Sequence, residues 1–170
     1  MKRAIDPAVA LAPDFRDCLA VLSEHHVVFI IVGGYALGWH GLVRATGDLD
    51  LLYECTRENV DRLCKALKDF GAPRHLVDPT FLNRSSAVTQ IGDPPLRIEL
   101  LASISGVSFA RAHAGSIEAH IDESTVRVIG LRELRRNKTA TGRDKDKGDL
   151  RRLTEARKRA SLESEEHDAN

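Results

Sequence analysis

Two short stretches of the sequence decide the fold: VVFIIVGG at residues 27–34 and DLDLL at residues 48–52. The first is a run of apolar, mostly β-branched residues, which predicts a buried strand. The strand ends at Gly33 and Gly34, where glycine allows a sharp turn and lets a ligand approach the backbone N–H groups. We therefore expect a strand, a glycine turn and then a second strand that carries two acids.

The second stretch places these two acids on one face of a strand. Side chains of a strand alternate between its faces, so Asp48 and Asp50 project to one side while Leu49 and Leu51 enter the core. Two carboxylates held this close raise each other's pKa unless a cation lies between them, and Mg²⁺ suits such oxygen ligands. The alternative is that the glycines form an ordinary turn and that both acids are solvated on an exposed strand face.

The residues after the glycines favour an anion site. Residues 35–39 can form a short helix, whose first N–H groups are unsatisfied and lie at the positive end of the helix dipole. A phosphate bound there would satisfy them. Tyr35 and Trp39 of this segment are spaced i and i+4, which is more typical of packing residues than of residues that stack on a base.

A third acid, Glu99, lies within the largely apolar run LRIELL at residues 96–101. An acid inside a strand is costly unless it is paired, bound to a metal or exposed. The alternation of Arg97 and Glu99 with Ile98 and Leu100 also fits a strand with one face in water. Considered together with the pair on residues 48–52, Glu99 becomes a candidate third carboxylate.

The rest of the chain alternates between helical and strand patterns. Asp14 is a candidate cap for a helix to about His25, and Thr56 and Gly71 are expected to begin and end a helix over 57–70. Strand pairs are predicted at 86–91 with 96–101 and at 116–121 with 125–129, followed by a helical segment from 131 to 160 that breaks near Gly142. We expect one domain over residues 1–160 and an acidic, disordered tail over 161–170.

Composition bounds the class of protein. With 170 residues, of which 42% are hydrophobic and 29% charged, the chain fits one globular domain. No apolar run is long enough to cross a membrane and no secretory signal is evident, so a cytoplasmic protein without a membrane partner is expected. Three cysteines without C-x-x-C spacing and scattered histidines argue against a disulfide framework and a zinc site.

Positive charge gathers near the C-terminus. Between residues 131 and 160 the sequence has twelve Lys and Arg residues against five acids. A solvated helix face explains most such runs, so this is weak evidence for a polyanion partner, and direct nucleic-acid binding stays open as an alternative function. Within the run, Asp146 and Asp149 are expected to order the basic segment by ion pairing or to cap the final helix, and not to be catalytic.

These motifs together resemble the nucleotidyltransferase superfamily, which has a polymerase-β-like fold. Its pattern is a strand, Gly-Gly or Gly-Ser, a short helix, Asp-x-Asp or Asp-x-Glu, and a third acid on a later strand, more often Asp than the Glu99 found here. The spacing of Arg44, Thr46 and Asp48 is similar to that of a small bacterial branch that includes minimal nucleotidyltransferases and AbiEii-type toxins. Lys138 followed by residues 143–150, RDKDKGDL, is similar to a C-terminal motif of that branch.

The resemblance implies an α/β (α+β) fold, with a mixed-sheet nucleotidyltransferase core flanked by helices and followed by C-terminal helices. It implies a Mg²⁺-dependent enzyme, with one or two ions, that transfers a nucleoside monophosphate from a nucleoside triphosphate, ATP among the candidates, to a hydroxyl group and releases pyrophosphate. The implied catalytic and metal-binding residues are Asp48, Asp50 and Glu99. The implied nucleotide-binding residues are Gly33, Gly34, Lys138, Arg143 and Lys145.

The sequence leaves the acceptor and the partners open. A tRNA, a small-molecule hydroxyl and a protein side chain all serve as acceptors for this core, and a homodimer or a partner protein is expected to complete the acceptor side of so short a chain. The alternative is a catalytically silent protein of the same fold that binds a nucleotide or a partner, as a toxin–antitoxin or regulatory component. Retention of all three acids favours an enzyme.

Overall fold

The computed structural model describes residues 3–4 and 11–168, and the side-chain surroundings of residues 11–162. In this part of the chain, seven strands form one mixed sheet in the order β1-β6-β7-β2-β3-β5-β4. The strands are β1 (Arg3–Ala4), β2 (Phe29–Val32), β3 (Asp48–Tyr53), β4 (Val88–Ile91), β5 (Arg97–Leu101), β6 (Ile117–Ile121) and β7 (Ser124–Val128). The mixed α/β class and the two predicted strand pairs are confirmed, since β4 with β5 and β6 with β7 are antiparallel.

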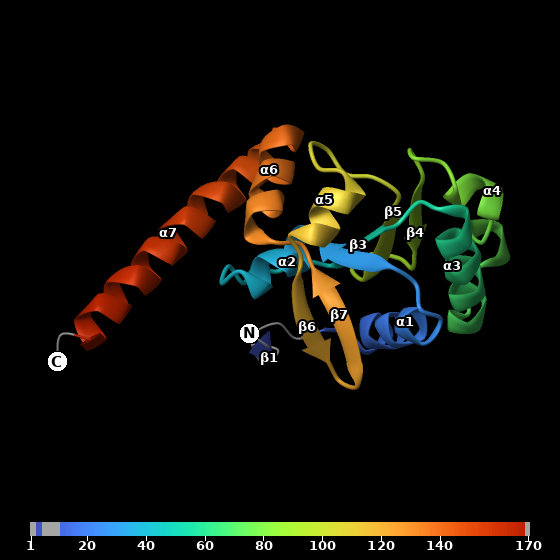
Figure 1. Ribbon diagram of the computed structural model, residues 1–170, viewed down its shortest axis with the longest axis horizontal. Coiled ribbons are helices and arrows are strands. Elements are labelled where there is room, and N and C mark those ends of the chain that lie inside the picture. The colour runs from blue at the N-terminus through green and yellow to red at the C-terminus, as the bar shows by residue number, and fades with distance from the viewer. Residues whose placement is uncertain (1–2, 5–10, 169–170) are drawn as a thin grey trace.

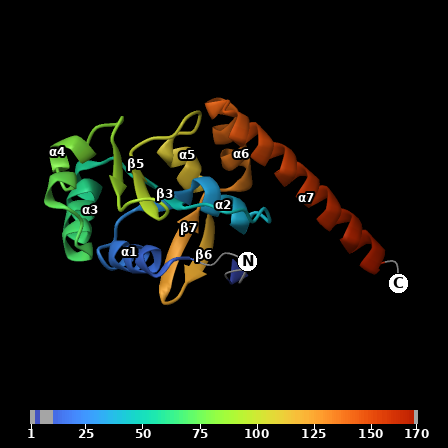
Figure 2. The same ribbon diagram turned by 180° about the vertical axis from the view of Figure 1, so that it is seen from behind.

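The helices flank this sheet and extend beyond it at the C-terminal end (Figures 1 and 2). They are α1 (Pro13–Glu24), α2 (Gly33–Trp39), α3 (Arg57–Phe70), α4 (Pro79–Leu82), α5 (Phe109–Ala114), α6 (Leu131–Thr141) and α7 (Asp144–Asp168), with a 3-10 turn at Arg74–Leu76. Helices α1 and α3 lie side by side, and α6 and α7 form a second helix pair. In both views the far half of α7 projects away from the sheet.

The core forms where the apolar patterns predicted it. All four residues of β2 are buried, as are Leu49 and Leu51 of β3, while Asp48 and Asp50 on the other face remain partly accessible. Apolar residues of two helices join the same core: Phe15, Leu19 and Leu22 of α1, and Val60, Leu63 and Leu67 of α3. One face of β3 therefore stabilises the fold, and the other is left for polar groups.

Local signals set most of the helix ends. The Thr56 side chain accepts a hydrogen bond from the Asn59 N–H, and Gly71 ends α3 with a left-handed φ of 86°. Gly142 ends α6 in the same way with a φ of 64°. Asp14, however, is not a cap: α1 begins at Pro13 with Ala12 at the cap position, because the φ of proline already suits the first helical turn.

The C-terminal tail is a second difference from expectation. Helix α7 continues to Asp168, so residues 161–168, predicted to be disordered, belong to a helix. The acidic composition suggested disorder, but this segment contains neither Gly nor Pro and its residues tolerate a helix that has already begun. Within the described part of the chain, no helix combines the length and the apolarity needed to cross a membrane.

Candidate active site

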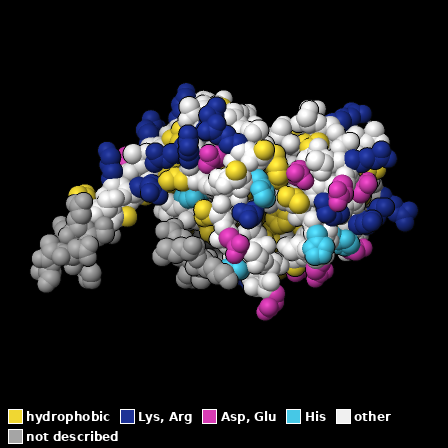
Figure 3. All heavy atoms as spheres, viewed as in Figure 1, with side chains coloured by type: hydrophobic (Ala, Val, Ile, Leu, Met, Phe, Trp, Pro, Cys, Tyr) yellow, Lys and Arg dark blue, Asp and Glu magenta, His cyan; other side chains and the backbone are white. Residues whose placement is uncertain are grey.

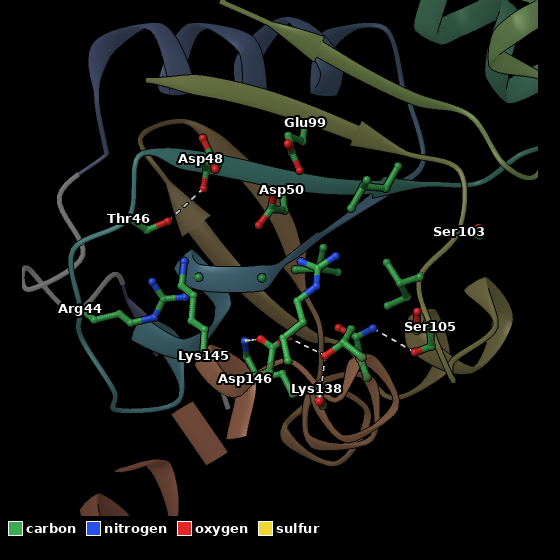
Figure 4. A pocket seen from close by; sticks show the side chains of 18 residues that line it. Arg44, Thr46, Asp48, Asp50, Glu99, Ser103, Ser105, Lys138, Lys145 and Asp146 are labelled. Atoms are coloured by element: carbon green, nitrogen blue, oxygen red, sulfur yellow. Dashed lines mark hydrogen bonds and ion pairs between the residues drawn. The ribbon is translucent and has the colours of Figure 1, made fainter. Parts of the chain in front are cut away.

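The three predicted acids lie on neighbouring strands. Strand β3 pairs in parallel with β5, and the register places Asp50 opposite Glu99 and Asp48 opposite Arg97. Alternation along each strand directs these four side chains to the same face of the sheet. Together with the turn after β2, this face forms one side of a cleft of about 520 Å³ (Figure 4). The pairing of β3 with β5 thus brings residues from two distant segments of the sequence to one site.

The glycine turn packs directly against Asp50. Gly33 has a φ of 66°, and a Cβ atom at this position would overlap Oδ2 of Asp50. The N–H of Gly34 donates a hydrogen bond to the Asp50 carboxylate. A Cβ on Gly34 would lie 2.8 Å from Oγ1 of Thr46, in the loop before β3. The two glycines therefore let the backbone approach the carboxylate, and both line the same cleft.

Asp50 is the most perturbed acid of the site. Burial, the charge of Glu99, a hydrogen bond with Glu99 and the charge of Asp48 raise the pKa of Asp50 to about 7, against the effect of the Gly34 N–H. Near neutral pH this group consequently exchanges a proton readily. A strongly perturbed carboxylate in a polar cleft is typical of a functional site.

Two neighbouring side chains hold the other acids. The guanidinium of Arg97 donates to both Asp48 oxygens, with Nε 3.1 Å from Oδ1 and Nη2 3.3 Å from Oδ2. Gln90 of β4 donates from Nε2 to Oε1 of Glu99 at 2.5 Å. Sequence reasoning noted Arg97 only as part of a wet strand face, because its pairing with Asp48 requires the register of β3 and β5. The matching i, i+2 spacing of Asp48 with Asp50 and Arg97 with Glu99 was the available signal.

The opposite side of the cleft is basic. Lys145 in the first turn of α7 and Arg143 just before it both line the cleft. Their predicted contacts with phosphate remain a prediction. Figure 4 shows Asp48, Asp50 and Glu99 on one side, with Lys145, Arg44, Lys138 and Asp146 across from them. Ser103 and Ser105, which follow β5, add hydroxyl groups to the lining and were not predicted. The cleft therefore has acidic side chains on one side and cationic side chains on the other.

Lys138 has a position that differs from the predicted phosphate contact. Its side chain is only 6% exposed, and Nζ lies 2.7 Å from Oδ1 of Asp146 and 2.9 Å from Oδ2 of Asp149. On the other side of Asp149, Nε of Arg44 lies 3.0 Å from Oδ1. A buried ammonium needs such partners, so the two carboxylates that complete the motif take up its charge. We call Lys138, Asp146, Asp149 and Arg44 the anchor network.

The anchor network joins the C-terminal helices to the loop before β3. Burial would raise the pKa of Asp146, but hydrogen bonds from Lys138 and Thr141 and the charges of Lys138 and Arg143 lower it below its usual value. The predicted ion-pairing role of Asp146 and Asp149 is confirmed. This network fixes the start of α7, and with it Lys145, relative to the strand that carries Asp48 and Asp50.

The carboxylate set has the chemistry of a divalent cation site. Hard ions such as Mg²⁺ take oxygen ligands, and three carboxylates that share one sheet face provide them. As the side chains lie, however, no group of three or more His, Cys, Asp or Glu residues among those described converges on one point. Arg97 binds Asp48 and Gln90 binds Glu99, so an ion between Asp48 and Asp50 must either displace Arg97 or share the Asp48 carboxylate with it.

The aromatic residues after the turn belong to the core, as expected. Tyr35 and Trp39 are 8% and 5% exposed, and the Tyr35 ring meets Phe15 edge-on with centroids 5.7 Å apart. The three cysteines are free thiols, as predicted. None of these residues lines the cleft.

Of three comparisons with known proteins, one found a match, and it concerns the fold. Neither protein-family models nor curated protein sequences match the chain. Among solved structures, the crystal structure of "a putative nucleotidyltransferase" from Thermotoga maritima is similar, with a TM-score of 0.55 and 12% sequence identity. The match covers 83% of this chain and 90% of that one. At this identity the similarity defines the fold alone: the chain has a nucleotidyltransferase fold.

Proposed function

We propose that the protein is a Mg²⁺-dependent nucleotidyltransferase. The observation that carries the proposal is the register of β3 and β5, which groups Asp48, Asp50 and Glu99 on one side of a cleft with Lys145 and Arg143 on the other. A triphosphate needs cationic groups for its oxygens and carboxylates for its metal. This cleft offers both in a fold of the matching class.

The transfer exchanges one phosphorus–oxygen bond for another. The acceptor hydroxyl oxygen forms a bond to the α-phosphorus, the bond from that phosphorus to the bridging oxygen of the β-phosphate breaks, and pyrophosphate leaves. Glu99 takes the acceptor proton, while Lys145 and Arg143 bind the departing phosphates. Gly33 and Gly34 line the cleft without a Cβ, so their backbone is placed to approach the outer phosphates.

The metal site is assigned to Asp48 and Asp50, with Glu99 as a further ligand. When bound, Mg²⁺, as one ion or two, neutralises the charge that develops on the phosphate oxygens. Lys138 is reassigned from phosphate contact to the anchor network, because two buried carboxylates hold its ammonium. The residues of this proposal therefore differ from the sequence prediction at one position.

The acceptor and the branch of the superfamily are part of the same proposal. A tRNA, a small-molecule hydroxyl or a protein hydroxyl remain the acceptor classes, with a second copy or a partner protein completing that side of the site. The Arg44, Thr46 and Asp48 spacing favours the branch of minimal nucleotidyltransferases and AbiEii-type toxins. The resemblance to those toxins supports including a role in a toxin–antitoxin system in the proposal, and the proposed location is the cytoplasm, as expected from the sequence.

The test uses nucleoside triphosphates that carry a radioactive label on the α- or the γ-phosphate and measures the label transferred to a tRNA, a small-molecule hydroxyl or a protein. Wild-type protein is expected to transfer label from the α-phosphate, but none from the γ-phosphate, because the γ-phosphate leaves with pyrophosphate. The Asp50→Asn variant should transfer neither, while Asp17→Asn, which changes an exposed acid of α1, should behave as wild type. Transfer by Asp50→Asn at the wild-type rate, or transfer of γ-label, would refute the proposal.

A second candidate function rests on α7. This helix carries five exposed basic residues, Arg151, Arg152, Arg157, Lys158 and Arg159. Lys and Arg side chains gather over α6 and α7 in Figure 3. Such a surface suits a polyanion such as a nucleic acid. Binding of a labelled oligonucleotide should then weaken steeply with salt, survive Asp50→Asn and be lost when Arg157, Lys158 and Arg159 are replaced by Gln.

A further inference from the structure

We propose that Arg97 is the resident counter-ion of Asp48 and competes with a divalent metal ion for that carboxylate. This inference rests on the proposed function, because it concerns the same metal site. The guanidinium donates to both oxygens of Asp48, so the cation position beside this acid is already filled by the protein's own side chain. A metal ion that binds Asp48 must displace Arg97 or share the carboxylate with a second positive charge.

The sheet holds Arg97 in this position. Arg97 is the register partner of Asp48, and its backbone N–H donates to the carbonyl oxygen of Gly47 at 2.9 Å. Gly47 itself packs tightly against the backbone of Pro95, just before β5. The two strands are therefore locked together immediately beside the pair. The ion pair forms from this backbone register and does not depend on a long reach across open solvent.

The surroundings of Arg97 allow a cation to replace its guanidinium at Asp48. The side chains of Arg97 and Asp48 are 30% and 38% exposed, so a hydrated cation can reach Asp48 without the opening of the core. The charges of Glu99 and Asp50 also act on Arg97, so a guanidinium released from Asp48 stays close to two other acids. Exposed pairs of this kind contribute little to stability, which leaves competition with a cation as the main consequence of the contact.

The consequence is a metal site that is weaker than its carboxylates alone would make it. Replacement of Arg97 by Gln removes the competing charge and leaves a shorter, neutral polar side chain. Replacement by Lys keeps the charge but removes the planar, bidentate geometry that matches a carboxylate. The affinity for a divalent ion should therefore rise in the order wild type, Arg97→Lys, Arg97→Gln.

The experiment titrates each metal-free protein with Mn²⁺ alone and measures free Mn²⁺ by electron paramagnetic resonance. Relative to wild type, we expect a Kd lower by about fivefold or more for Arg97→Gln and by about twofold for Arg97→Lys. Arg127→Gln is the matched control: it also removes one Arg from a strand, and its guanidinium bonds the Ser116 hydroxyl at 3.0 Å. Its Kd should equal that of wild type. Asp50→Asn reports whether the measured ion occupies the proposed site.

The outcomes separate this inference from the proposed function. An unchanged or higher Kd in Arg97→Gln, with wild-type binding that Asp50→Asn weakens, would overturn the role of Arg97 and leave the metal site standing. Absence of Mn²⁺ binding in every variant, or binding that Asp50→Asn does not affect, would overturn the metal site and the Arg97 inference with it. If Arg97→Gln does not fold by circular dichroism, Arg97→Lys decides the question, and a Kd equal to or above wild type overturns the inference.

Discussion

The carboxylate of Asp50 occupies the space that a side chain on Gly33 would need. The left-handed φ of 66° at Gly33 is a second, independent reason why this position favours glycine. The glycine turn and the acid are therefore one structural unit, even though 17 positions of sequence separate them. The close approach of backbone to carboxylate also brings the Gly34 N–H to Asp50.

Replacement of Gly33 by Ala should displace Asp50. The new Cβ overlaps Oδ2 and lies 3.1 Å from Cβ of Asp50, so the carboxylate must move and nucleotide affinity should fall by about tenfold or more. Gly142→Ala is the matched control, because Gly142 has a similar φ of 64° and nothing within 4 Å of the position of a Cβ. Both variants should lose about 1 kcal/mol of stability from the backbone alone. Calorimetric titration with nucleotide measures the affinity of both variants, and only Gly33→Ala should lose it. Equal affinities of the two variants would contradict a role for the contact with Asp50.

Replacement of Asp50 by Asn should stabilise the metal-free protein at alkaline pH. The pKa of Asp50 is raised from 3.8 to about 7, so the native state binds more protons than the unfolded state between these values and stability falls as pH rises through this window. Asn carries no such penalty. The gain in unfolding free energy should therefore be larger at pH 8 than at pH 5, by an amount on the order of 2 kcal/mol.

Urea denaturation in the presence of a chelator measures this difference. Asp17→Asn, which changes an exposed acid, serves as the control and should show the same small effect at both pH values. A gain for Asp50→Asn that does not depend on pH would argue against a strongly raised pKa at this site.

Replacement of Lys138 by Met should destabilise the anchor network. The substitution leaves Asp146 and Asp149 buried without the ammonium between them, at a cost of about 3 kcal/mol that Arg44 and Thr141 only partly offset. Lys147→Met is the control, because that side chain is 61% exposed and pairs only at the surface; its effect should stay within about 0.5 kcal/mol. Equal unfolding free energies for the two variants would contradict a buried anchoring role for Lys138.

The elements that local pattern predicts well are those whose causes are local. The run at residues 27–32, the alternation around Asp48 and the Thr56 and Gly71 caps each act within a few positions, and the structure has them as expected. The grouping of Asp48, Asp50 and Glu99 could be predicted because each is an acid within a largely apolar strand, and the register of β3 and β5 places them together. Fold class follows from the same order of elements, as the structural neighbour confirms.

The parts that could not be predicted depend on contacts between distant segments. Arg44 and Asp149 are 105 positions apart and Asp48 and Arg97 are 49 apart, so neither pair is visible before the sheet register and the helix packing are known. Lys138 was assigned to the nucleotide because it matches a C-terminal motif of the resembled branch, whereas in the structure its ammonium binds two acids of α7. The length of α7 was underestimated because its end was predicted from composition, whereas a formed helix extends at little cost through residues that contain neither Gly nor Pro.

In the proposed function, the cleft binds a nucleoside triphosphate through a metal and the carboxylates of Asp48 and Asp50. The most direct measurement is calorimetric titration with each of the four ribonucleoside triphosphates, with and without Mg²⁺, on wild type and on the Asp48→Ala/Asp50→Ala variant. We expect at least one triphosphate to bind, and its binding to require both Mg²⁺ and the two acids. Absence of binding to all four, or binding that is unchanged in the double variant, would contradict it.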